Sequence, residues 1–331
     1  MKIDFTHHQS AHCENGVVSN LLKHKGHNIS EPMVFGIGSG LFFVYIPFLK
    51  VNHGPAISFR PMPGFIFKRF AKRLGIKIKR YKFKNKKKAQ LTLDAELQNN
   101  NPVGMQVGVY HLSYFPDEYR FHFNAHNMVV YGKENDTYLI SDPVMETTTT
   151  LTEKELELVR FSKGAFAPKG HIYYPIQYPK ELNLEKAIKV GIKSTCRDML
   201  APVPIVGVNG MRLVAKLIRK WPVKKGKKVA NHYLGQIVRM QEEIGTGGGG
   251  FRFIYGAFLQ EAAIILKNDK LNELSAEITE IGNSWRDFAL DASRIYKNRS
   301  PELDAYNKIA DQLVALSNRE EVFFKKLRKA I

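Results

Sequence analysis

The amino-acid sequence predicts an α+β protein in which a region of mixed helices and strands precedes an all-α region. Up to residue 178, short apolar segments alternate with glycine, proline and asparagine, a pattern typical of strands and helices joined by turns. From residue 183 onward, apolar residues recur at helical spacing in longer segments. With 331 residues, 44% of them hydrophobic and 24% charged, the chain is long enough for two cores. We therefore expect a first domain over residues 1–178 and a helical second domain over residues 179–331.

Composition excludes several classes of protein. Two cysteines cannot form a disulfide framework, and no spacing of cysteine and histidine is typical of a zinc site, so neither a metal nor a cofactor is expected. The first residues turn polar at once, without the apolar run of a signal peptide. The most apolar stretch, residues 35–49, is interrupted by glycines and falls short of the ~18–20 residues of a membrane span. We expect a cytoplasmic protein without an integral membrane segment.

A short helix is predicted to begin at Cys13. Two pairs of apolar residues, at 17–18 and 21–22, lie four positions apart and give the helix one apolar face, and Gly26 is expected to end it. Unpaired backbone N–H groups and the positive end of the helix dipole gather at a helix start, and both favour a thiolate over a thiol. Cys13 is therefore a candidate nucleophile, although many free cysteines are only small buried residues. Cys196, which lies within a later helix without a basic neighbour, is expected to be inert.

A glycine-rich run follows the first helix. Gly36, Gly38 and Gly40 are spaced like the start of a dinucleotide-binding fingerprint, but Leu41 or Phe43 occupies the position of the required third glycine. We interpret this run as a tight backbone passage beside buried aromatic residues.

Residues 56–110 are predicted to form alternating strands and helices. The glycines of the last of these segments permit close approach of another backbone or side chain. The expected elements are a strand at 56–60, a basic helix at 65–74, a strand from residue 76, a helix at 91–97 and a strand at 103–110.

Residues from His126 to Tyr131 and from Thr137 to Asp142 are predicted to form the two strands of a hairpin. If Tyr131 pairs with Thr137, His126 lies directly opposite Asp142, and both project from one face with Cβ atoms ~5 Å apart. A shift by one residue would place them on opposite faces. In that case the two residues would be an exposed histidine and a turn aspartate before Pro143. The same face carries Met128, Val130, Tyr138 and Ile140.

The remaining elements are mainly helical. Thr152 and Glu155 form a capping box that opens a helix ending near Phe161, and a strand is expected at 171–174. The later helices are expected at 183–200, 209–221, 227–244, 251–267, 271–297 and 302–330. Their breaks are expected at Pro202 and Pro204, at Pro222, at 245–250, and at Ser300-Pro301.

The break at residues 245–250 resembles a phosphate-binding loop, but Phe251 occupies the position of its essential lysine. A glycine-rich entry to a helix can still hold an anion or admit a ligand. Arg252, Tyr255 and Glu261 on the following helix are therefore candidate cleft residues. The alternative is that they are ordinary polar residues of a helix surface.

Cys13 at a helix start, with His126 and Asp142 on a later sheet, matches the papain-like arrangement of catalytic residues. In this arrangement histidine accepts the thiol proton, aspartate orients the imidazole, and the thiolate attacks an acyl carbon. An oxyanion donor is also required. We expect the backbone N–H of Cys13 in this role, with the side chain of Gln9 as a further candidate.

Several motifs closely resemble the butirosin-biosynthesis BtrH N-terminal family. They are His12-Cys13-Glu14-Asn15, the glycine-rich run 29–40, residues 112–126, Val130-Tyr-Gly, Ser141-Asp-Pro and residues 162–169. Residues 245–261 resemble the helical domain commonly fused behind that family's domain.

The resemblance implies an acyltransferase with a cysteine-peptidase-like fold. The family's namesake moves an acyl group from an acyl-carrier-protein thioester to an amine of an aminoglycoside. By this resemblance Cys13 would be acylated, His126 would act as base and acid, and Asp142 would orient it. Glu14 and Glu31 match family positions and are expected to support the site or contact substrate. The resemblance does not identify the acceptor of this chain, because nothing in this sequence indicates an aminoglycoside pocket.

The chain is strongly basic, with a net charge of +19. Every charged residue between positions 68 and 88 is basic. No nucleic-acid-binding motif accompanies this segment, so nucleic acid is not expected as a partner. Acyl carrier proteins are acidic, and we expect this segment to dock one. The alternative is an ordinary solvated surface. The candidate docking residues are Lys77, Lys79, Arg80 and Lys82.

Three functions remain open from the sequence. The leading one is carrier-dependent transfer of an acyl group to an amine or hydroxyl of a small molecule, with the second domain covering or completing the substrate cleft. The aromatic runs 35–43 and 251–258 favour an apolar acyl chain. The second function is a cysteine peptidase or amidase, in which water replaces the acceptor. The third is a carrier- or membrane-binding protein without catalysis.

Overall fold

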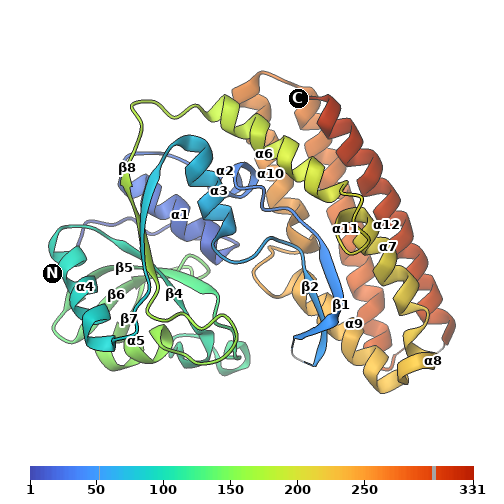
Figure 1. Ribbon diagram of the computed structural model, residues 1–331, viewed down its shortest axis with the longest axis horizontal. Helices are drawn as coiled ribbons and strands as arrows, with labels where there is room; N and C mark the ends of the chain where they lie inside the picture. Colours follow the sequence, from blue (N-terminus) through green and yellow to red (C-terminus); the bar gives the residue numbers. More distant parts are fainter. Residues whose placement is uncertain (52, 300–302) are drawn as a thin grey trace. The chain divides into compact units, whose positions relative to one another are not determined.

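A computed structural model describes residues 1–51, 53–299 and 303–331 (Figure 1). These residues form two compact units. The first unit comprises Met1–Val34 and Ala71–Leu182, and the second comprises Phe35–Phe70 and Asn183–Ile331. The sequence predicted one boundary after residue 178, whereas in the structure the segment Phe35–Phe70 belongs to the second unit.

In the described part of the chain, the first unit contains a six-stranded antiparallel sheet with the order β3-β8-β4-β5-β6-β7. The β5–β6 hairpin predicted from the sequence is present in this sheet. In chain order the strands are β3 (Lys77–Tyr81), β4 (Val103–Val107), β5 (His126–Glu134), β6 (Thr137–Ser141), β7 (Thr149–Thr152) and β8 (Ile172–Gln177). The first unit therefore has the mixed helix-and-sheet composition that the α+β prediction requires.

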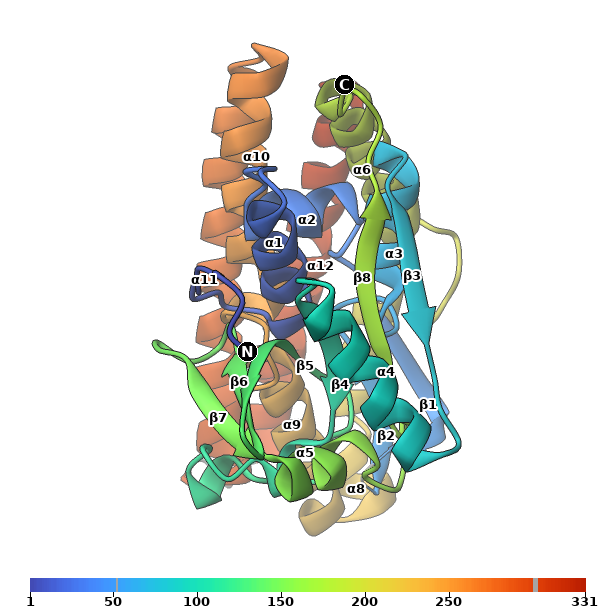
Figure 2. The same cartoon turned by 90° about the vertical axis from the view of Figure 1, so that its left-hand side faces the viewer.

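Two helices of the first unit, α4 (Lys86–Gln98) and α5 (Glu153–Arg160), share one apolar core with the sheet. Figure 2 shows both helices lying across the near side of the sheet. The predicted face of the hairpin is confirmed, because Met128, Val130, Tyr138 and Ile140 all belong to this core. The capping box predicted at the start of α5 is also present.

The helix α1 (Cys13–His24) packs against β5, β4 and β8. Its apolar residues Val17, Val18 and Leu22 are fully buried. Of the described residues of α1, none belongs to the apolar core that α4 and α5 share with the sheet. Two short 3-10 helices, η1 (Val109–His111) and η2 (Asp117–Tyr119), lie in the segment between β4 and β5.

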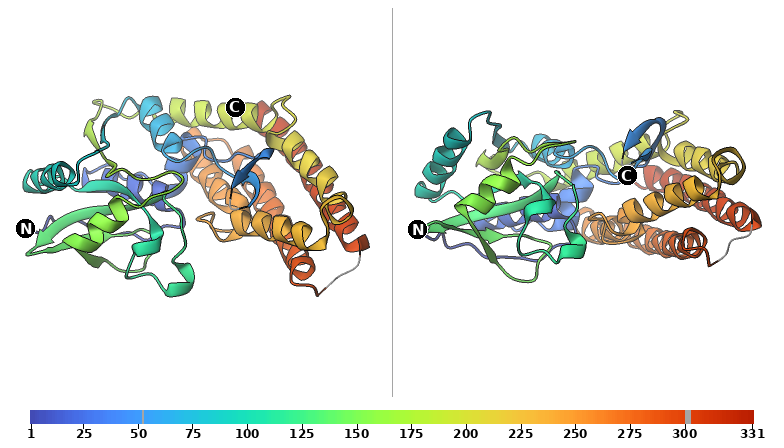
Figure 3. Two further views of the ribbon diagram at one scale, coloured as in Figure 1. Left: turned by 60° about the horizontal axis from the view of Figure 1, so that its bottom comes forward. Right: turned by 90° about the horizontal axis from the view of Figure 1, so that it is seen from below.

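The second unit is built mainly from helices, as the sequence predicted. A two-stranded sheet, β1 (Val44–Val51) and β2 (Gly54–Ser58), is added to them. Figure 3 shows the long helices α11 and α12 side by side. The helices are α6 (Leu184–Met199), α7 (Gly207–Ile218), α8 (Trp221–Lys225), α9 (Lys227–Glu242), η3 (Gly249–Phe251), α10 (Arg252–Leu266), α11 (Lys270–Tyr296) and α12 (Leu303–Lys329). The predicted break at Ser300-Pro301 lies outside the described residues.

Two further helices, α2 (Glu31–Ile37) and α3 (Phe65–Leu74), contain two of the three points where the chain passes from one unit to the other. The third point lies between Leu182 and Asn183. The predicted tight passage is confirmed at Gly36, where an added Cβ would lie 2.1 Å from the ring of Phe258. Among the described helices, none combines the length and the apolar composition that crossing a bilayer requires.

Candidate active site

Cys13 is the first residue of α1, as predicted. Its side chain is 6% exposed, and His12 before it has an extended backbone with φ −125° and ψ 122°. No side chain caps this end of the helix. The sulfur therefore lies at the positive end of the helix dipole, where negative charge is favoured.

The loop that enters α1 is held by Glu31. The Glu31 carboxylate accepts hydrogen bonds from the backbone N–H of Ala11 at 3.0 Å and of His12 at 2.6 Å. Burial raises the pKa of Glu31, and these two N–H groups oppose that rise. The structure thus gives Glu31 a part in fixing the backbone next to Cys13. Glu14, the other predicted acidic residue, is buried beside Cys13 in α1.

His126 and Asp142 are brought together by the β5–β6 hairpin. His126 Nε2 lies 2.6 Å from Asp142 Oδ2, and both side chains are buried. The Tyr114 hydroxyl donates to the same carboxylate oxygen at 2.7 Å, and the Val144 N–H donates to Oδ1 at 3.2 Å. Since Asp142 occupies Nε2, the other ring nitrogen, Nδ1, is left to face the Cys13 sulfur.

The predicted register of this hairpin is wrong, although the predicted pairing of side chains is correct. Glu134, and not Tyr131, pairs with Thr137. Asn135 begins the turn with φ 53°, the left-handed conformation that two-residue hairpin turns require. If this register continued along the strands, Asp142 would lie opposite Val129, on the face away from His126.

A β-bulge corrects the register. Gly132 pairs with Leu139, but the next pair is Val130 with Ile140, so Tyr131 is an extra residue in β5. Beyond the bulge Asp142 comes opposite Met128, on the same face as His126 and diagonal to it. Diagonal neighbours on one face are within reach of long side chains. The bulge therefore brings the carboxylate to the imidazole.

The N-terminal segment covers this bulge. The backbone N–H of Ile3 donates to the Tyr131 carbonyl at 3.1 Å, and the rings of Phe5 and Tyr131 stack with centroids 5.5 Å apart. Lys2 bridges to Gly132, where an added Cβ would lie 3.1 Å from the Lys2 Cα. The segment thus pairs with backbone groups of β5 beyond the last residue that pairs with β4.

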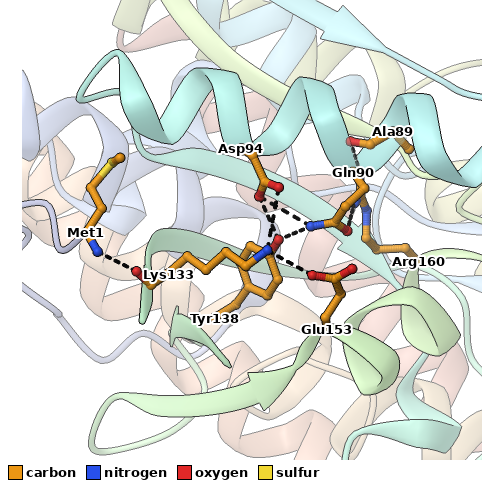
Figure 4. A network of polar contacts seen from close by, with 8 residues as sticks. All are labelled: Met1, Ala89, Gln90, Asp94, Lys133, Tyr138, Glu153 and Arg160. Carbon is orange, nitrogen blue, oxygen red and sulfur yellow. Dashed lines mark hydrogen bonds and ion pairs between the residues drawn. The ribbon is translucent and has the colours of Figure 1, made fainter. Parts of the chain in front are cut away.

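A polar network anchors the opposite end of the hairpin (Figure 4). The Tyr138 hydroxyl donates to Asp94 at 2.6 Å, and Lys133 Nζ lies 2.8 Å from Glu153 and 3.5 Å from Asp94. These contacts join β5 and β6 to α4 and to the start of α5. Both ends of the hairpin are therefore fixed, one by this network and the other by the His126–Asp142 pair.

The protonated form of His126 is stabilised by its neighbours. Burial by itself lowers the pKa of His126, but the Asp142 carboxylate and the Cys13 sulfur both interact with the ring and raise the pKa to about 10. An imidazole between a carboxylate and a sulfur is suited to accept the thiol proton and to return it later.

Sequence reasoning missed three residues of this site. Asn127 Nδ2 lies 3.8 Å from the Cys13 sulfur, and the Tyr173 hydroxyl donates to Asn127 Oδ1 at 2.8 Å. Tyr114, which holds Asp142, lies in a loop within the motif at residues 112–126. Alternation along β5 could have directed attention to Asn127, since a buried amide directly after a catalytic histidine requires partners.

The remaining predicted residues of the first unit lie on its surface. Gln9 is exposed in the loop before α1, and its role as an oxyanion donor stays a prediction. The predicted docking residues Lys77, Lys79 and Arg80 lie on β3, with Lys82 directly after it, and all four are exposed. β3 is an edge strand of the sheet. Lysines on edge strands also prevent unwanted strand pairing, which is the role of an ordinary solvated surface at this edge.

The proposed role of Arg252 in a cleft is not supported by the structure. Arg252 is 0% exposed, and its guanidinium donates to both oxygens of Glu320 at 2.9 Å. Trp285 Nε1 donates to the same carboxylate at 2.6 Å. A buried arginine paired in this way satisfies an internal charge and does not contact substrate.

The other two candidates lie on the same helix. Tyr255 is fully buried, so it does not line a cleft, and burial raises the pKa of its hydroxyl well above the usual range. Glu261 is half-buried, and its role as a cleft residue stays a prediction. The glycine-rich loop is not free to hold an anion at Gly249, because the Gly249 N–H donates to the Glu242 carboxylate at 3.1 Å.

The Arg252–Glu320 pair is expected to be a major contributor to the stability of the second unit. Replacing Glu320 with alanine leaves a buried guanidinium without its carboxylate and should lower the free energy of unfolding by about 3–5 kcal/mol. Denaturant unfolding measures this change. The exposed pair Arg219–Asp311 is the control, since Asp311→Ala should cost less than about 1 kcal/mol. Equal effects of the two substitutions would contradict the assignment.

The aromatic runs do not supply the acyl pocket that the sequence suggested. Phe35 and Phe251 stack with centroids 5.1 Å apart, and Phe43 packs edge-on against Phe59 at 5.3 Å. These rings are buried against one another in the core of the second unit. Their packing accounts for the aromatic composition, so the inference of an apolar acyl chain loses its basis.

Two family profiles match the chain. The profile of butirosin biosynthesis protein H, N-terminal, matches residues 12–143, and that of a domain of unknown function, DUF4872, matches residues 154–327. A search of curated proteins finds no significant match. Among solved structures, the chain is similar to a protein described as a C39-like peptidase from Bacillus anthracis, with 14% identity and a TM-score of 0.36 over 54% of this chain and 100% of that chain. That similarity is too weak to carry an argument about this chain.

Proposed function

The chain belongs to the family in which a butirosin biosynthesis protein H N-terminal domain precedes a DUF4872 domain, and we propose that it is a cysteine-dependent acyltransferase. The observation that carries this proposal is the geometry of the first unit. A cysteine begins a helix, and its sulfur interacts with an imidazole whose far nitrogen lies 2.6 Å from a buried carboxylate. This arrangement activates a thiol for attack on an acyl carbon.

The proposed donor is the thioester of an acidic acyl carrier protein. In the first step the Cys13 thiol gives its proton to His126, the sulfur attacks the acyl carbon, and the carbon–sulfur bond to the carrier breaks. The departing carrier thiolate takes the proton from His126 and leaves as a thiol. The developing oxyanion would be stabilised by the Cys13 N–H at the start of α1, with Gln9 as the candidate side-chain donor.

In the second step an amine or hydroxyl of a small molecule attacks the Cys13 thioester. His126 accepts the proton of the attacking group and returns it to the cysteine sulfur as the carbon–sulfur bond breaks. Asp142 holds the ring in place and stabilises its charged form in both steps. The product is an amide or ester, consistent with a role in specialised-metabolite biosynthesis.

Mass measurement of the protein after incubation with an acyl-carrier thioester tests the proposal. Transfer predicts an acyl adduct on Cys13 that persists until an acceptor is added. Rapid loss of the adduct to water without an acceptor would favour a peptidase or amidase. Absence of any adduct, with retained binding of the carrier, would favour a non-catalytic binding protein.

The basic β3 segment is the proposed docking surface for the carrier. Replacing Lys77, Lys79, Arg80 and Lys82 with glutamate should raise the Michaelis constant for the carrier about tenfold at low salt and flatten its salt dependence. Steady-state kinetics at several salt concentrations measures both effects.

The control carries the same change of net charge at another exposed site. It replaces four lysines of the second unit with glutamate, namely Lys220, Lys224, Lys225 and Lys228. A general effect of net charge would change both variants equally. Unchanged kinetics in the β3 variant would contradict the docking proposal.

A further inference from the structure

The side chain of Asn127 lies beside the Cys13 sulfur and is hydrogen-bonded at both ends. Its Nδ2 lies 3.8 Å from Cys13 Sγ and 3.1 Å from the Ala125 carbonyl oxygen. Its Oδ1 accepts from the Tyr173 hydroxyl at 2.8 Å. Asn127 is 5% exposed and Tyr173 is 3% exposed, so water does not readily replace these partners.

The orientation of the Asn127 amide follows from its partners. The Ala125 carbonyl oxygen can only accept a hydrogen bond, so the NH₂ group must be on the side of Ala125 and Cys13. One amide proton goes to Ala125, and the other is directed toward the sulfur. The amide oxygen then faces Tyr173, whose hydroxyl donates to it. A proton donor is thus aimed at the reacting sulfur.

Tyr173 is placed by the pairing of β8 with β4. Tyr173 pairs with Gly104, and an added Cβ at Gly104 would lie 2.6 Å from the Tyr173 ring. The absence of a side chain at Gly104 therefore lets the ring cross β4 toward Asn127. Burial raises the pKa of Tyr173 well above its usual range, and the nearby Glu14 and Cys13 raise it further. Tyr173 consequently stays neutral and remains a donor.

We propose that Asn127, held by Tyr173, is a further catalytic residue that donates from Nδ2 to the Cys13 sulfur and stabilises its thiolate. The inference rests on the proposed role of Cys13 as the nucleophile. When the thiol is activated, its proton goes to His126 and the negative charge on sulfur gains the Asn127 hydrogen bond. When sulfur bonds to the acyl carbon, that charge disappears, and Asn127 keeps both of its protons throughout.

The test is the pH dependence of alkylation of Cys13 by iodoacetamide, followed on the Cys13 peptide by mass spectrometry. Loss of a hydrogen bond to a charged group should raise the midpoint by about one pH unit in Asn127→Ala and in Tyr173→Phe. The midpoint belongs to the coupled Cys13–His126 pair. The other titratable groups near the sulfur are His12 and Glu14, both buried next to Cys13 in the chain, and Asp142 behind His126, and neither variant changes them. Tyr173 also interacts with Cys13, and Tyr173→Phe removes its hydroxyl.

Tyr174→Phe is the matched control. It removes the same hydroxyl one residue along β8, where the Tyr174 hydroxyl donates to Glu96 and not to Asn127. The midpoint in this variant should equal that of the unmodified protein. An unchanged midpoint in Tyr173→Phe, or an equal rise in Tyr174→Phe, would overturn the inference. If Asn127→Ala does not fold, Tyr173→Phe, which lacks one oxygen atom, still decides the question.

Iodoacetamide needs no acyl donor, so this test is independent of the transfer reaction. A shifted midpoint in a protein that transfers no acyl group would reject the proposed acyltransferase and retain the role of Asn127. A normal transfer reaction with unshifted midpoints would retain the proposed acyltransferase and reject the role of Asn127.

Discussion

Replacing Cys13 with alanine is expected to abolish acyl transfer, with a loss of kcat of at least about a thousandfold. The reason is chemical, because no covalent intermediate can form without the sulfur, and the remaining hydrogen bonds can only position the substrates. Transfer assays with an acyl-carrier thioester measure the rate, and mass spectrometry should show that the adduct is absent.

Cys196→Ala is the control for this prediction. Cys196 is buried within α6, and burial raises the pKa of its thiol to about 12, so it is a poor nucleophile. The Cys196 variant should therefore keep its activity. Retention of more than a tenth of the activity by Cys13→Ala would reject Cys13 as the nucleophile.

Replacing Asp142 with asparagine is expected to lower kcat by about 10²–10⁴-fold with little effect on the Michaelis constant. The carboxylate accepts hydrogen bonds from His126 and Tyr114, whereas an amide can present its NH₂ group to the ring and stabilise the wrong tautomer. The charge of Asp142 also opposes the effect of burial on His126. Without it, the pKa of His126 should fall.

The stability of the Asp142→Asn variant should depend on pH in a defined direction. The pKa of His126 is raised to about 10 in the folded protein, above the unfolded value of 6.5. Its stabilising contribution is therefore complete below pH 6.5 and is lost as the pH rises through about 10. The difference in free energy of unfolding between the unmodified protein and Asp142→Asn should be larger at pH 6 than at pH 10.

Tyr114→Phe separates the charge of Asp142 from its position. This variant keeps the carboxylate but removes one of its hydrogen bonds, so we expect a loss of kcat of only about tenfold. A loss as large as that of Asp142→Asn would mean that the position of the carboxylate matters more than its charge. A loss in neither variant would contradict the proposed role of Asp142.

The position of Cys13 at a helix start could be predicted because local sequence determines it. The apolar pairs at 17–18 and 21–22 define a helical face, and the glycine at 26 ends the helix in the structure as well. The shared face of the β5–β6 hairpin was also predictable, because alternation along a strand assigns each residue to one side of the sheet.

The candidate site of the second unit could not be predicted in the same way. Arg252 follows a glycine-rich loop, and in sequence this resembles an entrance to a ligand site. Its partner Glu320 is remote along the chain and lies on α12, so only the packing of the helices shows that the guanidinium is internal. The spacing of residues along one helix does not predict which residues of another helix they contact.

By itself the sequence determined the α+β class, the cysteine at the start of α1, and the residue types from which a catalytic triad is built. Only the tertiary structure decided how Asp142 reaches His126, because a two-residue turn and a bulge at Tyr131 replace the predicted register. It also decided that Asn127 and Tyr173 complete the surroundings of the sulfur. The physical reason is that helical and strand periods are local properties, whereas a bulge and a buried amide depend on segments that meet only in the folded chain.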